Sequence, residues 1–137
     1  MIRLAQHTDI EYIVSEMLKL RSQTGWAQYT HDGYTRSTLI PFVSDKLLDP
    51  SSVVYVFDGD VGVVAFCGVT LGYFPLPPHM LMATEWGWSG EKTPAVRCFQ
   101  SARRWAKHQG AELFCRTLAQ PGRSTTRIRE SITWETL

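Results

Sequence analysis

The sequence has no long apolar run and few cysteines, and each absence excludes a class of protein. No stretch approaches the roughly 18 apolar residues of a membrane span, and no apolar segment follows a basic start as in a signal peptide. The three cysteines, Cys67, Cys98 and Cys115, are an odd number without CxxC spacing. Each lies in an apolar run, which is typical of buried free thiols in a reducing compartment. We therefore expect a cytoplasmic protein with no membrane partner.

Signatures of metal, nucleotide and nucleic-acid binding are also absent. The four histidines lie on separate segments without a further ligand at metal spacing: His7, His31, His79 and His108. No GxSxG, Walker or Rossmann motif occurs. Three C-terminal arginines lack interleaved aromatic residues, so we expect neither a metal site nor a nucleic-acid partner.

Length and composition indicate one globular domain over residues 1–137. The content of 44% hydrophobic and 20% charged residues is typical of globular proteins. The charge is unevenly divided, because residues 1–88 hold 5 Lys/Arg against 9 Asp/Glu, whereas 89–137 hold 9 against 4. The basic half suits a polyanionic ligand, and ordinary solvated helix faces explain it equally well.

The clearest pattern is a strand–helix–strand unit over residues 80–118. Thr93 is the expected N-cap of the helix, Pro94 its first residue, and Gly110 the residue that ends it. Apolar residues recur at helical spacing: Val96, Phe99, Ala102 and Ala106. A strand on either side of such a helix predicts a right-handed unit with parallel strands.

The remaining segments predict a mixed fold in which three antiparallel strands precede this unit. Helices are expected from Thr8 or Asp9 to an end near Ser22 to Gly25, and over 38–48, because apolar residues recur there at helical spacing. Strands are expected over 2–4, 53–57, 61–73, 80–88, 113–118 and 131–137. The 61–73 strand is apolar at nearly every position, as expected of a strand covered on both faces.

Three stretches carry a resemblance to motif A of the GNAT superfamily of N-acetyltransferases. They are Glu85-Trp86-Gly87-Trp88, the helix end at 104–111 and the strand at 113–118. Small GNAT-like proteins encoded by bacteriophages look most similar. The resemblance implies an α/β (α+β) fold with a mixed, mostly antiparallel sheet, helices on both faces, one parallel βαβ unit, and fewer C-terminal elements than the family pattern.

The resemblance also implies a reaction, in which an amine attacks the thioester of acetyl-CoA directly. Glu85 is then the expected general base, acting through a water molecule, and a structural partnership with Arg116 is the alternative. Residues of the strand and of the diphosphate-binding segment are implied to hold acetyl-CoA: Trp86, Gly87, Trp88, Lys92, Thr93, Ala95, Val96 and Arg97.

The acceptor amine, a small molecule or a protein, is expected to contact the segment between the first two helices. By resemblance, four residues line that pocket: Trp26, Tyr29, His31 and Tyr34. The alternative is that these are aromatic residues of a surface loop that pack on the sheet. A second functional hypothesis is a catalytically inactive protein of this fold that binds a partner or forms part of a phage particle, as a homo-oligomer or in a phage assembly.

Overall fold

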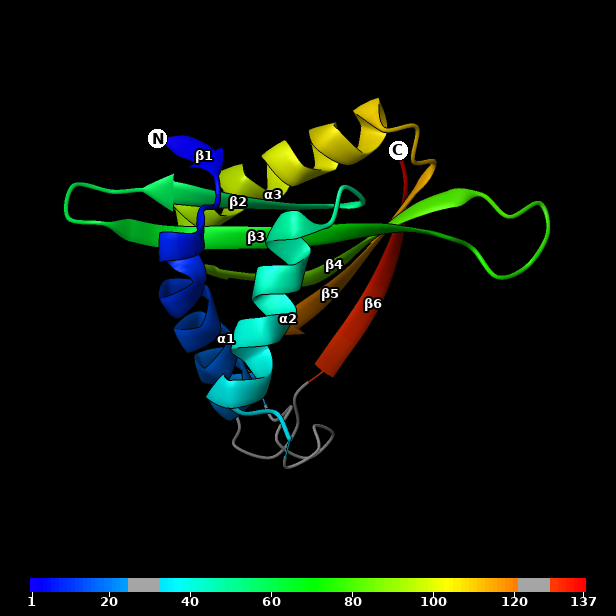
Figure 1. Ribbon diagram of the computed structural model, residues 1–137. Coiled ribbons are helices and arrows are strands. Elements are labelled where there is room, and N and C mark those ends of the chain that lie inside the picture. The colour runs from blue at the N-terminus through cyan, green and yellow to red at the C-terminus, as the bar shows by residue number, and fades with distance from the viewer. Residues whose placement is uncertain (25–32, 121–128) are drawn as a thin grey trace.

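One six-stranded sheet with helices on both faces forms the structure (Figure 1). The computed structural model describes residues 1–24, 33–120 and 129–137, with side chains at 1–20, 33–116 and 135–137. The strands are β1 (Ile2–Leu4), β2 (Ser52–Asp58), β3 (Val63–Tyr73), β4 (Leu81–Gly90), β5 (Leu113–Gln120) and β6 (Arg129–Thr136). The helices are a 3₁₀ turn (His7–Asp9), α1 (Ile10–Thr24), α2 (Arg36–Leu48) and α3 (Lys92–His108).

The strands follow one another across the sheet in chain order. Every neighbouring pair is antiparallel except β4 and β5, which run parallel on either side of α3 in the sequence. The expected meander, the parallel βαβ unit and the final strand are therefore confirmed. Among the described residues, no helix is long and apolar enough to cross a membrane.

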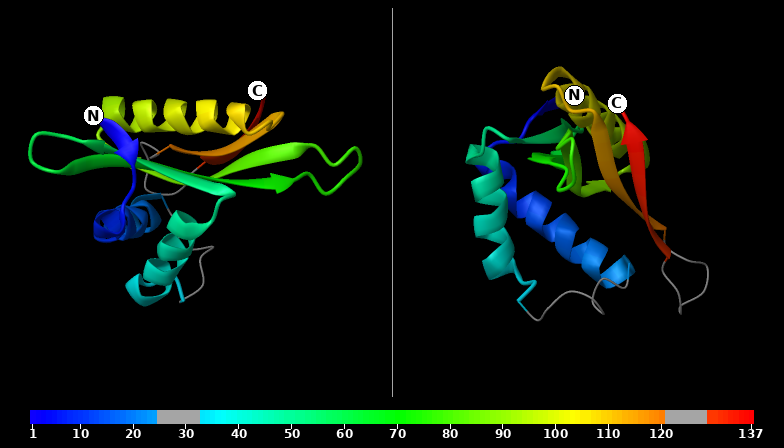
Figure 2. Two further views of the ribbon diagram at one scale, coloured as in Figure 1. Left: turned by 45° about the horizontal axis from the view of Figure 1, so that its top comes forward. Right: turned by 90° about the vertical axis from the view of Figure 1, so that its right-hand side faces the viewer.

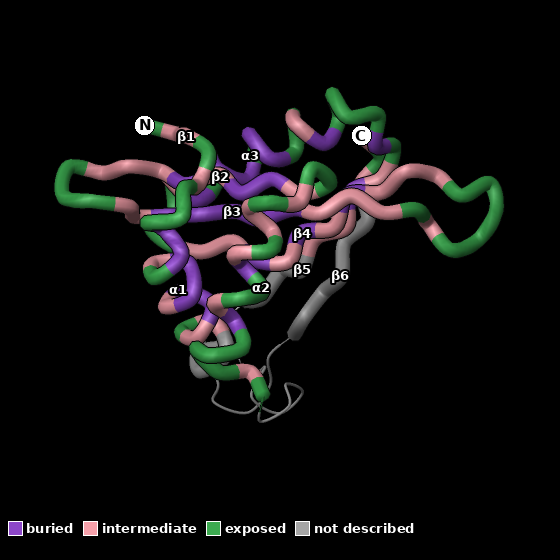
Figure 3. Tube along the Cα trace, in the orientation of Figure 1, coloured by how far each residue is buried: buried purple, intermediate pink, exposed green. Residues whose placement is uncertain are grey.

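The two faces of the sheet carry separate cores (Figures 1 and 2). Helix α3 covers one face, and α1 and α2 cover the other. Strand β3 contributes side chains to both cores, because Ala65, Cys67 and Val69 face α3 whereas Phe66 faces α1 and α2. Buried residues accordingly follow β3 and the inner sides of the helices (Figure 3). This alternation is why the strand is almost continuously apolar, as predicted.

The start of α3 differs from the prediction. The helix begins at Lys92 with Glu91 as its N-cap, and β4 continues to Gly90, so a single residue joins strand and helix. Pro94 is the third helical residue, a position where its missing N–H also costs nothing. The predicted stripe is confirmed at Phe99, Ala102 and Ala106 but not at its first position, where Ala95 is buried and Val96 is 38% exposed.

Helix α1 begins at Ile10, as predicted for a cap at Asp9, whereas α2 begins two residues earlier than predicted. A 3₁₀ turn capped by Gln6 precedes α1, and the backbone N–H of Gln6 donates to the carboxylate of Asp9 (2.7 Å). Arg3 donates to this carboxylate (2.7 Å) and to that of Asp58 (2.6 Å), which ties β1 to the helix and to β2. Helix α2 starts at Arg36, capped by Thr35.

Gly90 makes the direct passage from β4 into α3 possible. Its φ of +120° is in the region that favours glycine, and a Cβ there would lie 2.2 Å from the carbonyl oxygen of Val64 and 2.5 Å from the Cα of Ala65. The next N–H, that of Glu91, donates to the Val64 carbonyl (2.9 Å). The N-terminus of α3 is thereby attached to β3.

We expect Gly90→Ala to lower the free energy of unfolding by about 2–5 kcal/mol, because backbone strain and a backbone clash add. Urea denaturation at neutral pH measures this change. Gly72→Ala is the matched control, because a Cβ at this β3 glycine meets nothing within 4 Å, and alanine there should be neutral or stabilising by up to about 1 kcal/mol. Equal losses in the two variants would contradict this explanation.

A second prediction concerns acid sensitivity. The hydrogen bond from Arg3 lowers the pKa of the buried Asp9 carboxyl. Its stabilisation is therefore complete above the unfolded-state pKa of about 3.9 and is lost as the pH falls through the lower folded-state value. Asp9→Asn should cost about 2–3 kcal/mol at pH 7 and progressively less below about pH 4, as measured by urea denaturation against pH. Asp60→Asn, at an exposed carboxylate, should change stability little at either pH.

Candidate functional site

Strands β4 and β5 separate soon after they meet. Only three parallel pairs join them: Met82 with Leu113, Ala83 with Phe114, and Thr84 with Cys115. Beyond these, β5 pairs with β6 as far as Gln120, whereas Gly87, Trp88 and Ser89 of β4 pair with β3 alone. The strands thus diverge towards the N-terminus of α3, and backbone groups of β4 face the opening.

A β-bulge lies where the strands diverge. Gly68 of β3 is opposite Gly87, and the next residue, Val69, is opposite Glu85, so Trp86 is the extra residue of β4. A bulge leaves its extra residue outside the ladder and redirects the side chains around it. Trp86 lies over Gly68, and a Cβ on Gly87 would be 3.1 Å from Phe66, so both positions point to the α1/α2 side.

The two tryptophans thus lie on opposite faces of the sheet. Trp86 meets the ring of Phe42 from α2 edge-on, with centroids 5.3 Å apart. Its indole N–H is buried and has no hydrogen-bond partner within the described part of the chain. Trp88 packs on Phe99 of α3, also at 5.3 Å.

Glu85 lies just before the bulge and is 7% exposed. It follows Ala83 by two residues and therefore shares its α3 side of the strand. Burial raises the pKa of the Cys67 and Cys115 thiols, and the negative charge of Glu85 raises both further. Arg116, the alternative partner, binds Glu135 at 2.8 Å and lies over the ring of Phe99.

The N-terminus of α3 offers a limited set of donors for an anion. Lys92 and Thr93 are the first two helical residues, whose N–H groups have no intrahelical acceptor. Pro94 has no N–H, and that of Ala95 already donates to the Glu91 carbonyl (2.8 Å). The side chains of Lys92 and Arg97 are exposed and add positive charge.

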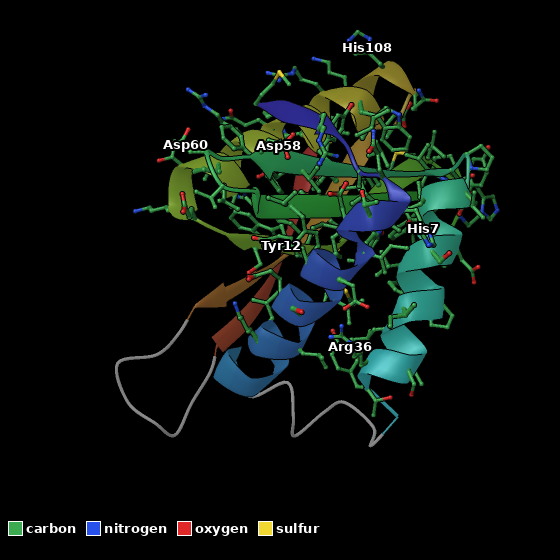
Figure 4. All side chains as sticks on the ribbon, turned by 60° about the vertical axis from the view of Figure 1, so that its left-hand side comes forward. His7, Tyr12, Arg36, Asp58, Asp60 and His108 are labelled. Atoms are coloured by element: carbon green, nitrogen blue, oxygen red, sulfur yellow. The ribbon has the colours of Figure 1, made fainter. Side chains whose placement is uncertain are left out.

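An acidic recess lies beside this helix end. It has a volume of about 730 Å³ between the β2–β3 hairpin, Met1 and the first turn of α3, and Asp58, Asp60 and Glu91 are among its lining residues. Figure 4 shows Asp58 and Asp60 at the hairpin end of the sheet. Asp58 is paired with Arg3, so mainly Asp60 and Glu91 disfavour an anion on this side, and an anionic ligand of the helix N-terminus is favoured on the side of β4 and β5.

Helix α1 contributes two residues that sequence reasoning missed. Glu16 is buried and accepts a hydrogen bond from the Ser89 hydroxyl at the end of β4 (2.8 Å). Burial raises the pKa of Tyr12, one turn earlier, and the charges of Glu16 and Glu91 raise it further. Figure 4 shows Tyr12 where α1 meets the sheet. The available signal was a glutamate inside the apolar stripe formed by Ile13 and Met17.

Of the expected acceptor residues, Tyr34 is half-buried against the core beneath α1 and α2. The other three, Trp26, Tyr29 and His31, lie outside the described residues. Cys67 and Cys98 are buried free thiols, as expected, whereas Cys115 is half-buried. In the described part of the chain, no group of three or more His, Cys, Asp or Glu side chains could hold a metal ion.

Comparison with solved structures shows that the chain has the fold of GNAT acetyltransferases. An acetyltransferase from Vibrio fischeri is 19% identical, with 85% of this chain and 93% of that chain covered and a TM-score of 0.64. A predicted acetyltransferase from Clostridium acetobutylicum, solved with acetyl-CoA, is 16% identical, with 90% of this chain and 83% of that chain covered and a TM-score of 0.66. An N-acetyltransferase from Staphylococcus aureus Mu50 is 22% identical, with 90% of this chain and 75% of that chain covered and a TM-score of 0.66. No protein-family model matches the sequence, and neither does any curated protein.

The described residues fit acetyl-CoA, the co-substrate that the family resemblance implies. The β4 edge beyond Thr84 offers backbone groups to an extended pantetheine, and Lys92, Thr93 and Arg97 offer two N–H donors and two positive charges to a diphosphate. The two N–H groups are fewer than a helix start without proline provides. The two cationic side chains therefore carry more of the expected affinity.

We expect Lys92→Ala and Arg97→Ala each to weaken acetyl-CoA binding roughly three- to tenfold and to reduce its salt dependence, because each removes one exposed charge near the start of α3, where the family resemblance implies that the diphosphate binds. Calorimetric titration at two salt concentrations measures both effects. Lys107→Ala removes an equal charge from the other end of the same helix and should leave the affinity nearly unchanged. An equal loss in all three variants would indicate general attraction to a basic helix and no localised site.

Proposed function

We propose that the protein is an N-acetyltransferase that transfers the acetyl group of acetyl-CoA to an amine. The observation that carries the proposal is the opening between β4 and β5, with a bulge at Trp86 and the buried carboxylate of Glu85 beside it. It presents strand backbone, a carboxylate and a helix N-terminus in chain order along one edge. The similarity of the fold to an acetyltransferase from Vibrio fischeri and an N-acetyltransferase from Staphylococcus aureus Mu50 supports the proposal.

When bound, acetyl-CoA supplies a thioester whose carbonyl carbon accepts the amine nitrogen, so that a C–N bond forms, the C–S bond breaks and the thiolate takes up a proton. We propose that backbone N–H groups of β4 near the bulge stabilise the negative charge that develops on the carbonyl oxygen. The diphosphate is held by Lys92, Thr93 and Arg97. The pantetheine lies along the edge of β4 formed by Trp86, Gly87 and Trp88. Ala95 and Val96 take part only as framework.

Glu85 is proposed to accept the proton that the attacking ammonium loses, through one water molecule. Its side chain lies on the α3 side of the sheet, whereas Tyr34 lies on the α1/α2 side. Past Thr84 no β5 residue pairs with β4, so within the described strands the sheet does not separate the two faces there. We propose that the amine enters from the α1/α2 side, lined by Tyr34 and by the segment with Trp26, Tyr29 and His31.

Two observations favour a second candidate, a non-catalytic protein of this fold that binds a partner or belongs to a phage particle. The N-cap of α3 is an acidic residue, Glu91, and Pro94 removes a donor, which weakens the anion site. No tyrosine occurs between residues 74 and 137, so this stretch, which includes β5 and β6, offers no phenol to protonate a leaving thiolate. Binding of acetyl-CoA without turnover of any amine would favour this candidate.

We expect Glu85→Gln to lower turnover at least about a hundredfold at pH 7 while acetyl-CoA affinity stays within about twofold, because glutamine keeps the shape and cannot accept the proton. Thiol release measured over a panel of polyamines, aminoglycosides and peptide amines provides the assay. Glu112→Gln, at an exposed carboxylate before β5, is the matched control and should keep wild-type turnover. Unchanged turnover in Glu85→Gln would remove Glu85 from the mechanism, and an unfolded variant would make its role structural.

A further inference from the structure

A buried carboxylate on α1 is attached to the end of β4. Glu16 is 9% exposed. One carboxylate oxygen accepts the hydroxyl hydrogen of Ser89 (2.8 Å), and the other accepts a hydrogen bond from Lys19 (3.0 Å). The two elements are 73 residues apart in the chain, so this contact is a long-range connection between a helix and the edge of the proposed site.

Glu16 is a costly way to fill its position. It belongs to the apolar stripe that includes Ile13 and Met17, and a buried carboxylate is tolerated only when it is paired and hydrogen-bonded. The Lys19 side chain is 63% exposed, so its ion pair contributes little. An apolar residue of similar size would serve stability equally well. The carboxylate is better explained by its hydrogen bond to Ser89, which holds the end of β4.

Ser89 occupies the part of β4 that has a strand on one side only. It pairs with Phe66 of β3, and β5 has already turned away. Two residues before it stands Gly87 at the bulge, and two residues after it stands Glu91, the cap of α3. Without a second strand, this stretch is held from the α1/α2 side by the Glu16 carboxylate.

We propose that Glu16 is a positioning residue, which through Ser89 holds the end of β4 in the geometry that binds the pantetheine and diphosphate of acetyl-CoA. This inference rests on the proposed function. It assigns to α1 a part in binding the acyl donor, in addition to its place beside the acceptor segment. Glu16 itself touches no reacting atom.

Calorimetric titration of acetyl-CoA at 25 °C tests the proposal. We expect Ser89→Ala and Glu16→Met each to weaken binding about tenfold, because each removes the hydrogen bond. The double variant should be no weaker than either single variant, because both changes break the same interaction. Ser89→Thr keeps the hydroxyl and should stay within about threefold of the wild type.

The matched control is Ser52→Ala, which removes another 2.8 Å side-chain hydrogen bond of the sheet, that between Ser52 and Thr70, and should leave the affinity unchanged. Melting temperatures of the ligand-free variants confirm that all are folded at 25 °C. If Ser89→Ala does not fold, Glu16→Met decides alone. Wild-type affinity in the folded variants overturns this inference only, whereas a wild-type protein that binds no acetyl-CoA overturns the proposed function and this inference together.

Discussion

The opening between β4 and β5 depends on the packing of one tryptophan against one glycine. A Cβ on Gly68 would lie 2.1 Å from the ring of Trp86, so the bulged side chain fits only because its neighbour in β3 has none. Phe42 of α2 packs edge-on against the same tryptophan ring. The bulge is thus built into the core, and it lets β4 leave β5 while its pairing with β3 continues on both sides of Trp86.

The face opposite Trp86 is built for close approach. The side of α3 that meets the sheet is formed mostly by small residues, namely Ala95, Cys98, Ser101, Ala102 and Ala106. Two large residues are exceptions: Phe99, which packs against Trp88 and Phe114, and the partly buried Trp105. Because small side chains bring the helix axis near the strands, α3 can follow β4 with a single residue, Glu91, between them. The position of the helix N-terminus beside the strand edge is therefore a consequence of packing.

The fold could be predicted because the spacing of apolar residues along the chain indicates which side of each helix or strand is buried. The strand at 63–73 is apolar on both faces and the helices carry apolar stripes, so the antiparallel strands and the parallel unit that follows them could be predicted. The start of α3 was not, since the Thr93–Pro94 pair resembles a cap and first residue although proline fits anywhere in the first turn.

The site was predictable only in part. Glu85 and the basic residues at 92 and 97 stand out by type, and the family resemblance supplies their roles. The bulge leaves no distinct mark, because Trp86-Gly87-Trp88 also suits regular alternation and the shift depends on Gly68, 18 residues earlier. The bond from Ser89 to Glu16 joins segments 73 residues apart. Such contacts are set by tertiary packing, which a pattern within one segment does not contain.

The charges at the start of α3 determine how an acyl donor would be held. Glu91 places a negative charge where the helix dipole favours one, so the free protein already stabilises its helix end, and an arriving diphosphate gains less there than at an uncharged cap. Lys92 and Arg97 offset that charge but are exposed, where salt screens them. The strand edge is made of backbone and is insensitive to salt. The part of the affinity that salt does not screen would therefore depend on the geometry of β4, which Trp86 opens at one end and the Ser89–Glu16 bond holds at the other.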